Sequence, residues 1–205
     1  MFAGSTGSGK TYAMLKLAGW YFGKKQIIVI DTKGDSSIKR LKAPVATVLL
    51  QMSKYDDPRK HPLVVFRPTG AAMADPATFN QMFEWVFRRG HTMVLIDEAS
   101  QVSAGSTQPS VGMLDMVTRG RDRGVQVWSA TQRPVGVPVI LLSECEVFFC
   151  FSLRRRGDRR TMDDYTRDGF AEMVPDDPGA KHAFAWYRPG ETPRMFRSIT
   201  QGQKS

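Results

Sequence analysis

The sequence lacks the features that would place it outside ordinary globular proteins. Only 2 of its 205 residues are cysteine, and neither lies at the spacing of a zinc site. The longest apolar stretches, at 135–142 and 147–151, are far shorter than the ~20 residues that a membrane-spanning helix needs. A chain of this length buries enough surface to fold without disulfides or a structural metal. These absences exclude collagen, coiled-coil, disulfide-scaffold and membrane-spanning proteins.

The amino terminus also lacks the basic patch and apolar region of a secretory signal. With so little cysteine, this predicts a cytoplasmic protein in a reducing compartment, with Cys145 and Cys150 as buried structural thiols. What the sequence does have is positive charge: 29 Lys and Arg against 20 Asp and Glu give a net charge of +9. Such an excess indicates a polyanionic partner, although ordinary basic proteins carry as much.

Short apolar runs alternate with amphipathic segments along most of the chain. Runs rich in Val, Ile, Leu and Phe predict strands at 26–31, 63–66, 93–97, 125–130 and 146–151. Helical spacing predicts helices at 10–22, 76–89, 110–123 and 157–167. Two further short strands are expected at 183–187 and 193–199, around a Pro-Gly turn. The pattern indicates an α/β fold with a mostly parallel sheet covered on both faces.

A glycine-rich loop near the amino terminus matches the pattern G-x-x-x-x-G-K-[ST] in full. Its residues are Gly4, Ser5, Thr6, Gly7, Ser8, Gly9, Lys10 and Thr11. Glycines let successive N–H groups point at phosphate oxygens, and the following helix directs its positive end to the same anion. Lys10 is expected to reach the β- and γ-phosphates, and the Thr11 hydroxyl to ligate Mg²⁺. The loop predicts a P-loop NTPase, a RecA-like (ASCE) three-layer sandwich, with ATP and Mg²⁺ as cofactors.

Two acidic residues follow the apolar run at 93–96. Asp97, at the end of the predicted strand, is expected to hold Mg²⁺ through its water shell. Glu98 lies one residue further on, where a carboxylate can orient and polarise the attacking water. An apolar run ending in two acids is common, so this assignment depends on its pairing with the loop at 4–11.

Two segments, Arg-Asp-Arg-Gly-Val at 121–125 and Ala-Thr-Gln-Arg-Pro at 130–134, resemble the FtsK/HerA superfamily of ring-forming DNA-translocating ATPases. The P-loop, the acids after residue 96, and the segments at 30–34 and 158–161 agree with that superfamily in order. Thr32 stands where the superfamily usually has proline. The similarity spans residues 4 to about 164, and it implies a motor core at 1–167 with an extension at 168–205, together one domain.

The resemblance implies roles for further residues. Gln132 would be the sensor that reports hydrolysis, and an amide there can bond both a phosphate oxygen and the lytic water. The alternative for Gln132 is a simple strand cap. Arg121 is the leading candidate for a finger inserted into a neighbouring subunit's site. Arg119, Arg123 and Arg160 compete with it, and a solvated or DNA-facing charge is an equal alternative for each arginine.

A core this small resembles the genome-packaging ATPases of tailless icosahedral and related viruses. The resemblance implies an ATP-hydrolysing translocase of double-stranded DNA that works as a homo-oligomeric ring, a hexamer or pentamer. Capsid vertex or portal proteins are further expected partners, and the location is the host cytoplasm or the virion. A cellular DNA-processing or conjugation ATPase stays open as an alternative. So do an assembly ATPase resembling the zonula occludens toxin group and a nucleotide-dependent switch, which would need neither Glu98 nor a sensor.

Two basic clusters and one loop are candidates for DNA contact. The first cluster is Lys33, Lys39, Arg40 and Lys42. The loop at 103–110 is rich in small and hydroxyl residues that can follow a phosphate backbone without reading sequence. The second cluster comprises residues 154–156 with Arg159 and Arg160. It can line a pore, face the next subunit's nucleotide or form a solvated surface.

Overall fold

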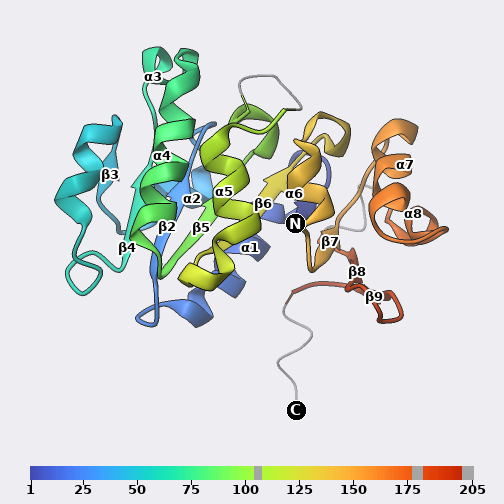
Figure 1. The fold of residues 1–205 in the computed structure, drawn as a ribbon. Helices are drawn as coiled ribbons and strands as arrows, with labels where there is room; N and C mark the ends of the chain where they lie inside the picture. The colour runs from blue at the N-terminus through green and yellow to red at the C-terminus, as the bar shows by residue number, and fades with distance from the viewer. Residues whose placement is uncertain (104–107, 177–181, 200–205) are drawn as a thin grey trace.

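The strands form one mostly parallel sheet in the computed structural model, which describes residues 1–103, 108–176 and 182–199 (Figure 1). The parallel strands are β1 (Phe2–Ala3), β2 (Gln26–Ile30), β3 (Val45–Ala46), β4 (Leu63–Phe66), β5 (Thr92–Ile96), β6 (Gln126–Thr131) and β7 (Phe148–Cys150). Two antiparallel strands, β8 (Phe184–Tyr187) and β9 (Arg194–Phe196), extend the sheet beyond β7. Within these ranges the order is β3-β4-β2-β5-β6-β1-β7-β8-β9.

Helices cover both faces of the sheet, so the fold has three layers (Figure 1). One face is covered by α1 (Lys10–Ala18) and α2 (Ser36–Lys39). The other is covered by α4 (Pro76–Arg89), α5 (Val111–Arg119), α6 (Val139–Ser143), α7 (Arg156–Tyr165) and α8 (Phe170–Met173). A short helix, α3 (Gly70–Ala74), leads into α4. This confirms the predicted α/β architecture.

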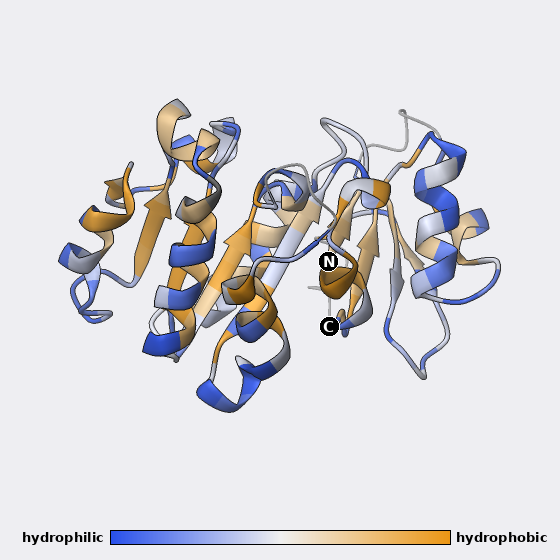
Figure 2. Cartoon of the chain, turned by 45° about the horizontal axis from the view of Figure 1, so that its top comes forward, coloured by the Kyte–Doolittle hydropathy of each residue, from blue (hydrophilic) through white to orange (hydrophobic). Residues whose placement is uncertain are grey.

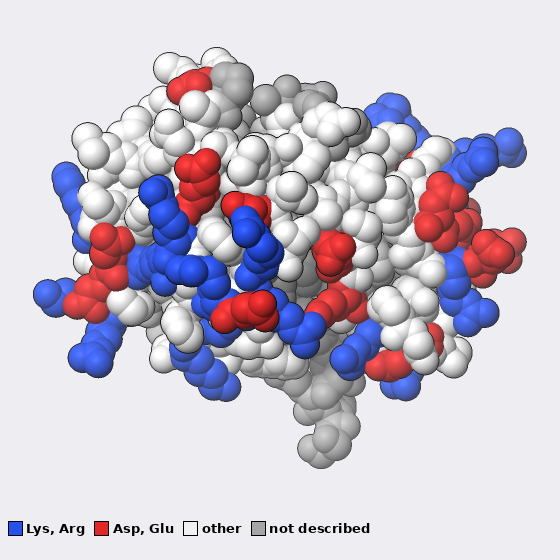
Figure 3. Space-filling view, viewed as in Figure 1, with Lys and Arg blue, Asp and Glu red and all other residues white. Residues whose placement is uncertain are grey.

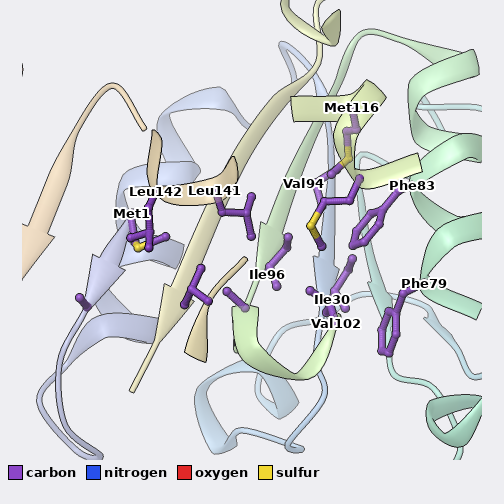
Figure 4. Packing of buried hydrophobic residues seen from close by; sticks show 14 of the residues in the cluster. Met1, Ile30, Phe79, Phe83, Val94, Ile96, Val102, Met116, Leu141 and Leu142 are labelled. Carbon is purple, nitrogen blue, oxygen red and sulfur yellow. The ribbon is translucent and has the colours of Figure 1, made fainter. Parts of the chain in front are cut away.

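The strands are apolar on both faces because both faces are buried. Along β2, Ile28 and Ile30 belong to the core under α4 and α5, whereas Ile27 and Val29 belong to the core under α1. Figure 2 shows the consequence: several of the parallel strands are hydrophobic along their length, and the longer helices present a hydrophilic outer side. Figure 4 shows Ile30 and other strand residues packed near Phe83 of α4. Burial of such residues supplies the main stabilisation of the fold.

Most predicted elements are confirmed, two of them with the predicted bounds, β4 and α4. Three helices end earlier than expected. The helix α7 ends at Tyr165, and α1 and α5 each pass into a short 3₁₀ turn, at Gly19–Tyr21 and Arg121–Arg123. Several short elements have too few residues to show a period and were not predicted: α2, α3, α6, α8, β3 and the 3₁₀ helix Leu49–Tyr55.

The strand β6 lies between the strand of the P-loop and the strand of the two acids. Phe2 of β1 pairs with Ala130 of β6, and Ile96 of β5 pairs with Ser129 of β6. The P-loop leaves the sheet between β6 and β7, where Gly4 N–H donates to the carbonyl of Thr131 at 3.1 Å. Because parallel strands end on the same side, the residues after β1, β2, β5, β6 and β7 gather at one end of the sheet, its carboxyl end.

Both cysteines are free, and Cys150 is fully buried, which raises the pKa of its thiol. The predicted burial is confirmed for Cys150, whereas Cys145 is only partly buried. Among the described residues, no helix has the length and apolar character that crossing a bilayer requires.

Candidate nucleotide-binding and catalytic site

The P-loop wraps around the start of α1. Its glycines supply left-handed backbone at Gly7, with φ 76°, and at Gly9, with φ 100°. The first hydrogen bond of α1 runs from Ala13 N–H to the carbonyl of Gly9 at 2.9 Å. The N–H groups of Lys10, Thr11 and Tyr12 therefore have no acceptor within the helix. A helix start with free N–H groups and a positive dipole end is a site for phosphate.

The side chain of Lys10 is buried within the P-loop. Its ammonium donates to the carbonyl of Ser5 at 2.9 Å, and the residue is 6% exposed. Burial lowers the pKa of Lys10 to about 8, and it does so against the attraction of Glu98. An anion beside this ammonium would favour its charged form, so the side chain is suited to binding phosphate.

Thr11 and Asp97 meet across the sheet as the predicted pair. The Thr11 hydroxyl donates to Oδ1 of Asp97 at 2.8 Å. Asp97 is 4% exposed, and burial raises the pKa of its carboxyl. A hydroxyl and a carboxylate in contact are oxygen ligands of the kind that Mg²⁺ binds beside phosphates. A cation would relieve the cost of burying this carboxylate, so the donor set fits Mg²⁺.

Glu98 lies at the centre of a hydrogen-bond network. Its carboxylate accepts from the hydroxyls of Thr131 at 2.8 Å and Ser100 at 2.9 Å, and it pairs with the ammonium of Lys33. Burial raises the pKa of Glu98, but the hydrogen bonds from Lys33, Thr131 and Ser100 outweigh burial and hold the pKa below its usual value. Glu98 is therefore an ionised carboxylate, as a group that polarises water must be.

The segment after β2 positions Lys33 in this network. Asp31 is fully buried, and its Oδ1 accepts from the N–H groups of Gly34 at 2.7 Å and Asp35 at 3.1 Å. Its Oδ2 accepts from Arg67 at 2.7 Å. The carboxylate thus fixes a tight turn that carries Lys33 to Glu98. Lys33 was predicted to belong to a basic DNA cluster, but in the structure its ammonium contacts Glu98.

Gln132 lies beside Glu98 at the end of β6. Its backbone N–H donates to the Glu98 carboxylate at 3.2 and 3.3 Å. Its side-chain amide has no hydrogen-bond partner among the residues that the structure describes. An amide held by its backbone next to the carboxylate, with its own donors and acceptor available, is placed as a phosphate sensor would be.

Three buried hydroxyls at the carboxyl end of the sheet lack partners within the described chain: Ser8 Oγ, Thr32 Oγ1 and Ser152 Oγ. Buried polar groups are normally hydrogen-bonded, and each unpaired one costs about 1–3 kcal/mol. Ser8 belongs to the P-loop itself, and the N–H of Ser5 donates to the carbonyl of Ser152 at 2.7 Å. Unpaired hydroxyls around the loop fit a site that completes its hydrogen bonds with an oxygen-rich ligand.

The candidate arginines lie at different ends of the sheet. The turn that contains Arg121 precedes β6, and Arg121 pairs with Glu146 at 3.1 Å, just before β7. Arg121 therefore lies at the amino end, away from its own P-loop. Arg160 is exposed on α7, which packs against the 3₁₀ turn Pro134–Gly136 that follows β6. Arg160 therefore lies at the carboxyl end.

Other arginines of the predicted sets have structural contacts. Arg123 donates to the carbonyl oxygens of Phe87 at 2.6 Å and Arg88 at 2.7 Å, which satisfies the end of α4. Arg159 donates to the carbonyl of Val174 at 3.1 Å and ties α7 to the end of α8. Arg119 pairs with Asp115 within α5.

Two segments that carry the resemblance to the superfamily also contact each other. Arg133 donates to Asp158 at 2.9 Å, and Asp158 is 2% exposed. This pair joins the segment at 130–134 to the segment at 158–161, 25 residues further along the chain. The candidate DNA loop at 103–110 lies outside the described residues at 104–107.

Comparison with known proteins agrees with this geometry. No protein-family model matches the chain. A curated relative, the DNA packaging ATPase P9 of Enterobacteria phage PRD1, is 28% identical over 160 residues, which cover 78% of this chain and 66% of the relative. The chain is a homologue of this packaging ATPase. The match leaves about a third of the relative's length uncovered.

Solved structures share the fold. The genome packaging NTPase B204 of Sulfolobus turreted icosahedral virus 2, in complex with ATP-gammaS, matches with a TM-score of 0.73 at 19% identity, over 97% of this chain and 95% of that one. VirB4 of Thermoanaerobacter pseudethanolicus matches with a TM-score of 0.69 at 10% identity, over 95% and 87% of the two chains. The α/β P-loop NTPase fold and the resemblance to viral genome-packaging ATPases are confirmed.

Proposed function

We propose that this chain is an ATP-hydrolysing motor that moves double-stranded DNA during viral genome packaging. The observation that carries the proposal is the meeting of Lys10, Thr11, Asp97, Glu98 and Gln132 at one end of the sheet, in a homologue of a DNA packaging ATPase. These side chains come from α1, β5 and β6, and together they provide a phosphate clamp, a cation site, a base and a sensor.

The chemistry follows from these positions. Mg²⁺ held by Thr11 and Asp97 would supply positive charge to the β- and γ-phosphate oxygens. Lys10 exchanges the carbonyl of Ser5 for a phosphate oxygen, and the free N–H groups of the loop bind the rest of the anion. Glu98 orients the attacking water and accepts its proton, while Gln132 bonds to the γ-phosphate. Glu98 must give up one of its present hydrogen bonds to hold that water.

The transition state also gains from a positive charge beside the γ-phosphate, in addition to that of Lys10. We assign that charge to a neighbouring subunit of a ring, with Arg121 first and Arg160 second. Arg121 is 86% exposed, and its contact with Glu146 is a surface pair of small energy. Arg160 is exposed at the carboxyl end, where an adjoining nucleotide is accessible. We propose a hexameric or pentameric ring, because a finger acting in trans couples hydrolysis in one subunit to movement of the next.

Contact with DNA is proposed for exposed cations that meet phosphates. Three cations at the end of α2 and just beyond it are exposed: Lys39, Arg40 and Lys42. They keep the role predicted for their cluster, from which Lys33 is now excluded. Figure 3 shows that Lys and Arg on the viewed face are interleaved with Asp and Glu. Several of these arginines pair with acids, so this face has no uninterrupted basic track.

The setting of the proposed activity is the host cytoplasm or the virion, with a capsid vertex or portal protein as the further partner. The cellular and filamentous-phage alternatives are not favoured, because the relative found by sequence is a viral packaging ATPase. We further propose that the core at 1–167 and the extension at 168–205 act as one domain, since β8 pairs with β7 and continues the core sheet.

The proposal is tested by measuring ATP hydrolysis with and without duplex DNA. We expect duplexes of unrelated sequence to stimulate hydrolysis equally. We also expect the logarithm of DNA affinity to fall linearly with the logarithm of salt concentration, because phosphate contacts release counterions. Lys10→Ala serves as the inactive control. Hydrolysis that is indifferent to DNA, with no DNA binding at low salt, would remove DNA from the function and leave an ATPase.

A further inference from the structure

The segment that follows Gln132 is held by Asp158, a residue in the first turn of α7. One carboxylate oxygen of Asp158, Oδ2, accepts a hydrogen bond from Nε of Arg133 at 2.9 Å. The other, Oδ1, accepts from the backbone N–H of Val135 at 3.3 Å. Asp158 therefore fixes the chain directly beyond the proposed sensor.

Gln132 itself is held on the opposite side by Glu98. The N–H of Gln132 donates to the Glu98 carboxylate at 3.2 and 3.3 Å. The hydroxyl of Thr131 donates to the same carboxylate at 2.8 Å and accepts from the N–H of Arg133 at 3.0 Å. The backbone of Gln132 therefore lies between two carboxylates, one that follows β5 and one on α7, and both contact its neighbours in the chain.

Asp158 is buried although it is an acidic residue. It is 2% exposed, whereas the side chain of its partner Arg133 is 46% exposed. Burying a carboxylate is costly unless it is paired and hydrogen-bonded, and well-packed apolar residues often stabilise a fold as much as a buried ion pair does. What the pair adds is a fixed distance and angle between its partners. In the described chain, both hydrogen bonds of this carboxylate fix the segment after Gln132.

The helix α7 is itself anchored to its surroundings. Oδ1 of Asp163 accepts from the N–H of Ala171 in α8 at 2.7 Å. Arg159 donates to the carbonyl of Val174 at 3.1 Å, and α7 packs against the 3₁₀ turn that follows β6. A helix anchored in this way gives Asp158 a defined position from which to hold that turn.

We propose that Asp158 is a positioning residue for ATP hydrolysis: through its contact with Arg133 it holds Gln132 where the side-chain amide meets the γ-phosphate. This inference rests on the proposed function, in which Gln132 is the phosphate sensor. Accurate placement matters, because a displacement of about 1 Å can lower a rate about 10²-fold. Asp158 acts through Gln132 and not on the nucleotide. The same contacts connect the sensor to α7, which carries the exposed Arg160.

The test is a double-mutant cycle between Asp158 and Gln132. The kcat and KM for ATP are measured for the parent, Asp158→Asn, Gln132→Ala and the double variant. Asp158→Asn keeps the size of the side chain and removes the charge that holds Arg133, so kcat should fall about 10- to 100-fold while KM stays near that of the parent. In the Gln132→Ala background the same substitution should have almost no further effect, because no amide is left to position.

Asp163→Asn is the matched control, since it removes a carboxylate and its contact from the side of α7 that meets α8. It should leave kcat unchanged. Urea unfolding of each variant establishes that it is folded under the conditions of the assay. If Asp158→Asn does not fold, Arg133→Gln replaces it in the cycle, because it breaks the same ion pair at its more exposed member.

The outcomes separate this inference from the proposed function. A parent without ATPase activity, or a Gln132→Ala protein with the parental kcat, would overturn the proposed function and this inference with it. If Gln132→Ala is slow but Asp158→Asn has the parental kcat, only the inference is overturned. Losses that multiply in the double variant, or an equal loss in Asp163→Asn, would show that Asp158 supports the fold and not the sensor. A loss that disappears in the Gln132→Ala background supports the inference.

Discussion

The ammonium of Lys33 pairs with the carboxylate of Glu98, and this pair connects the turn after β2 to the end of β5. Glu98 is 3% exposed, whereas the side chain of Lys33 is 29% exposed. The negative charge of Glu98, the base of the proposed reaction, is thus balanced by Lys33, whose side chain is accessible to water. Because Glu98 also accepts the N–H of Gln132, the turn, the base and the sensor form one connected unit.

Loss of Lys33 should raise the pKa of Glu98. In Lys33→Met the buried carboxylate keeps the cost of burial but loses its nearest cation, so its ionised form requires a higher pH. We expect the acidic limb of the pH profile of kcat/KM to move upward by about 1 to 3 pH units. Lys24→Met, which removes an exposed lysine outside the proposed site and DNA cluster, is the control. An unmoved acidic limb would show that the pair does not tune the base.

Nucleotide binding should take up protons near the pKa of Lys10. Burial lowers the pKa of Lys10 to about 8 in the free protein, and bound phosphate favours the charged amine. At pH 8, binding should therefore take up about half a proton, and affinity should fall as the pH rises further. Calorimetry in buffers of different ionisation enthalpy measures this uptake. Lys10→Arg stays charged throughout, so its proton uptake should vanish. Equal uptake in both proteins would place the proton elsewhere.

Replacement of Glu98 should separate binding from turnover. Glu98→Gln keeps most of the shape of the side chain and removes its basicity, so kcat should fall about 10²- to 10⁴-fold while ATP affinity stays near that of the parent. Lys10→Ala should instead lose ATP binding. Single-turnover kinetics and equilibrium binding distinguish the two effects. Hydrolysis at the parental rate by Glu98→Gln would contradict its assignment as the base.

The contact of Arg123 with α4 predicts a loss of stability without a catalytic role. Arg123→Ala leaves the carbonyls of Phe87 and Arg88 without their donor, so the free energy of unfolding should fall by about 1 kcal/mol. Urea unfolding followed by circular dichroism measures it. Arg121→Ala breaks only an exposed pair with Glu146 and should leave the midpoint unchanged. Equal midpoints for the two variants would refute the capping role.

The arginine finger can be found by mixing two inactive proteins. Glu98→Gln and Arg121→Ala should each lack activity alone. In a mixed ring, some interfaces combine an intact Glu98 with an intact Arg121, so partial ATPase activity should return. The same experiment with Arg160→Ala tests the second candidate. No recovery despite demonstrated co-assembly would count against Arg121 in trans, and an active Arg121→Ala protein would move the assignment to Arg160.

The sequence by itself determined those features that depend only on residues near one another in the chain. The glycines of residues 4–9 must adopt backbone that other residues avoid, and the apolar runs must be buried, so the P-loop, the strands and Asp97 with Glu98 could be predicted. The helix over 76–89 was predicted from its spacing, and its bounds agree with the structure, where Asp75 caps its start and Gly90 follows its end.

The tertiary structure decided which distant groups meet. Lys33 and Glu98 are 65 residues apart, and no spacing rule distinguishes a lysine that reaches a buried acid from one that faces DNA. The insertion of β6 between β1 and β5 depends on the order of strands, which no local pattern records. His182 reaches Ser8 only because β8 pairs with β7 and returns the chain to the P-loop. Such contacts depend on the order of strands across the whole sheet. Burial stabilises any apolar surface, whereas a hydrogen bond or an ion pair needs a particular partner at the right distance and angle.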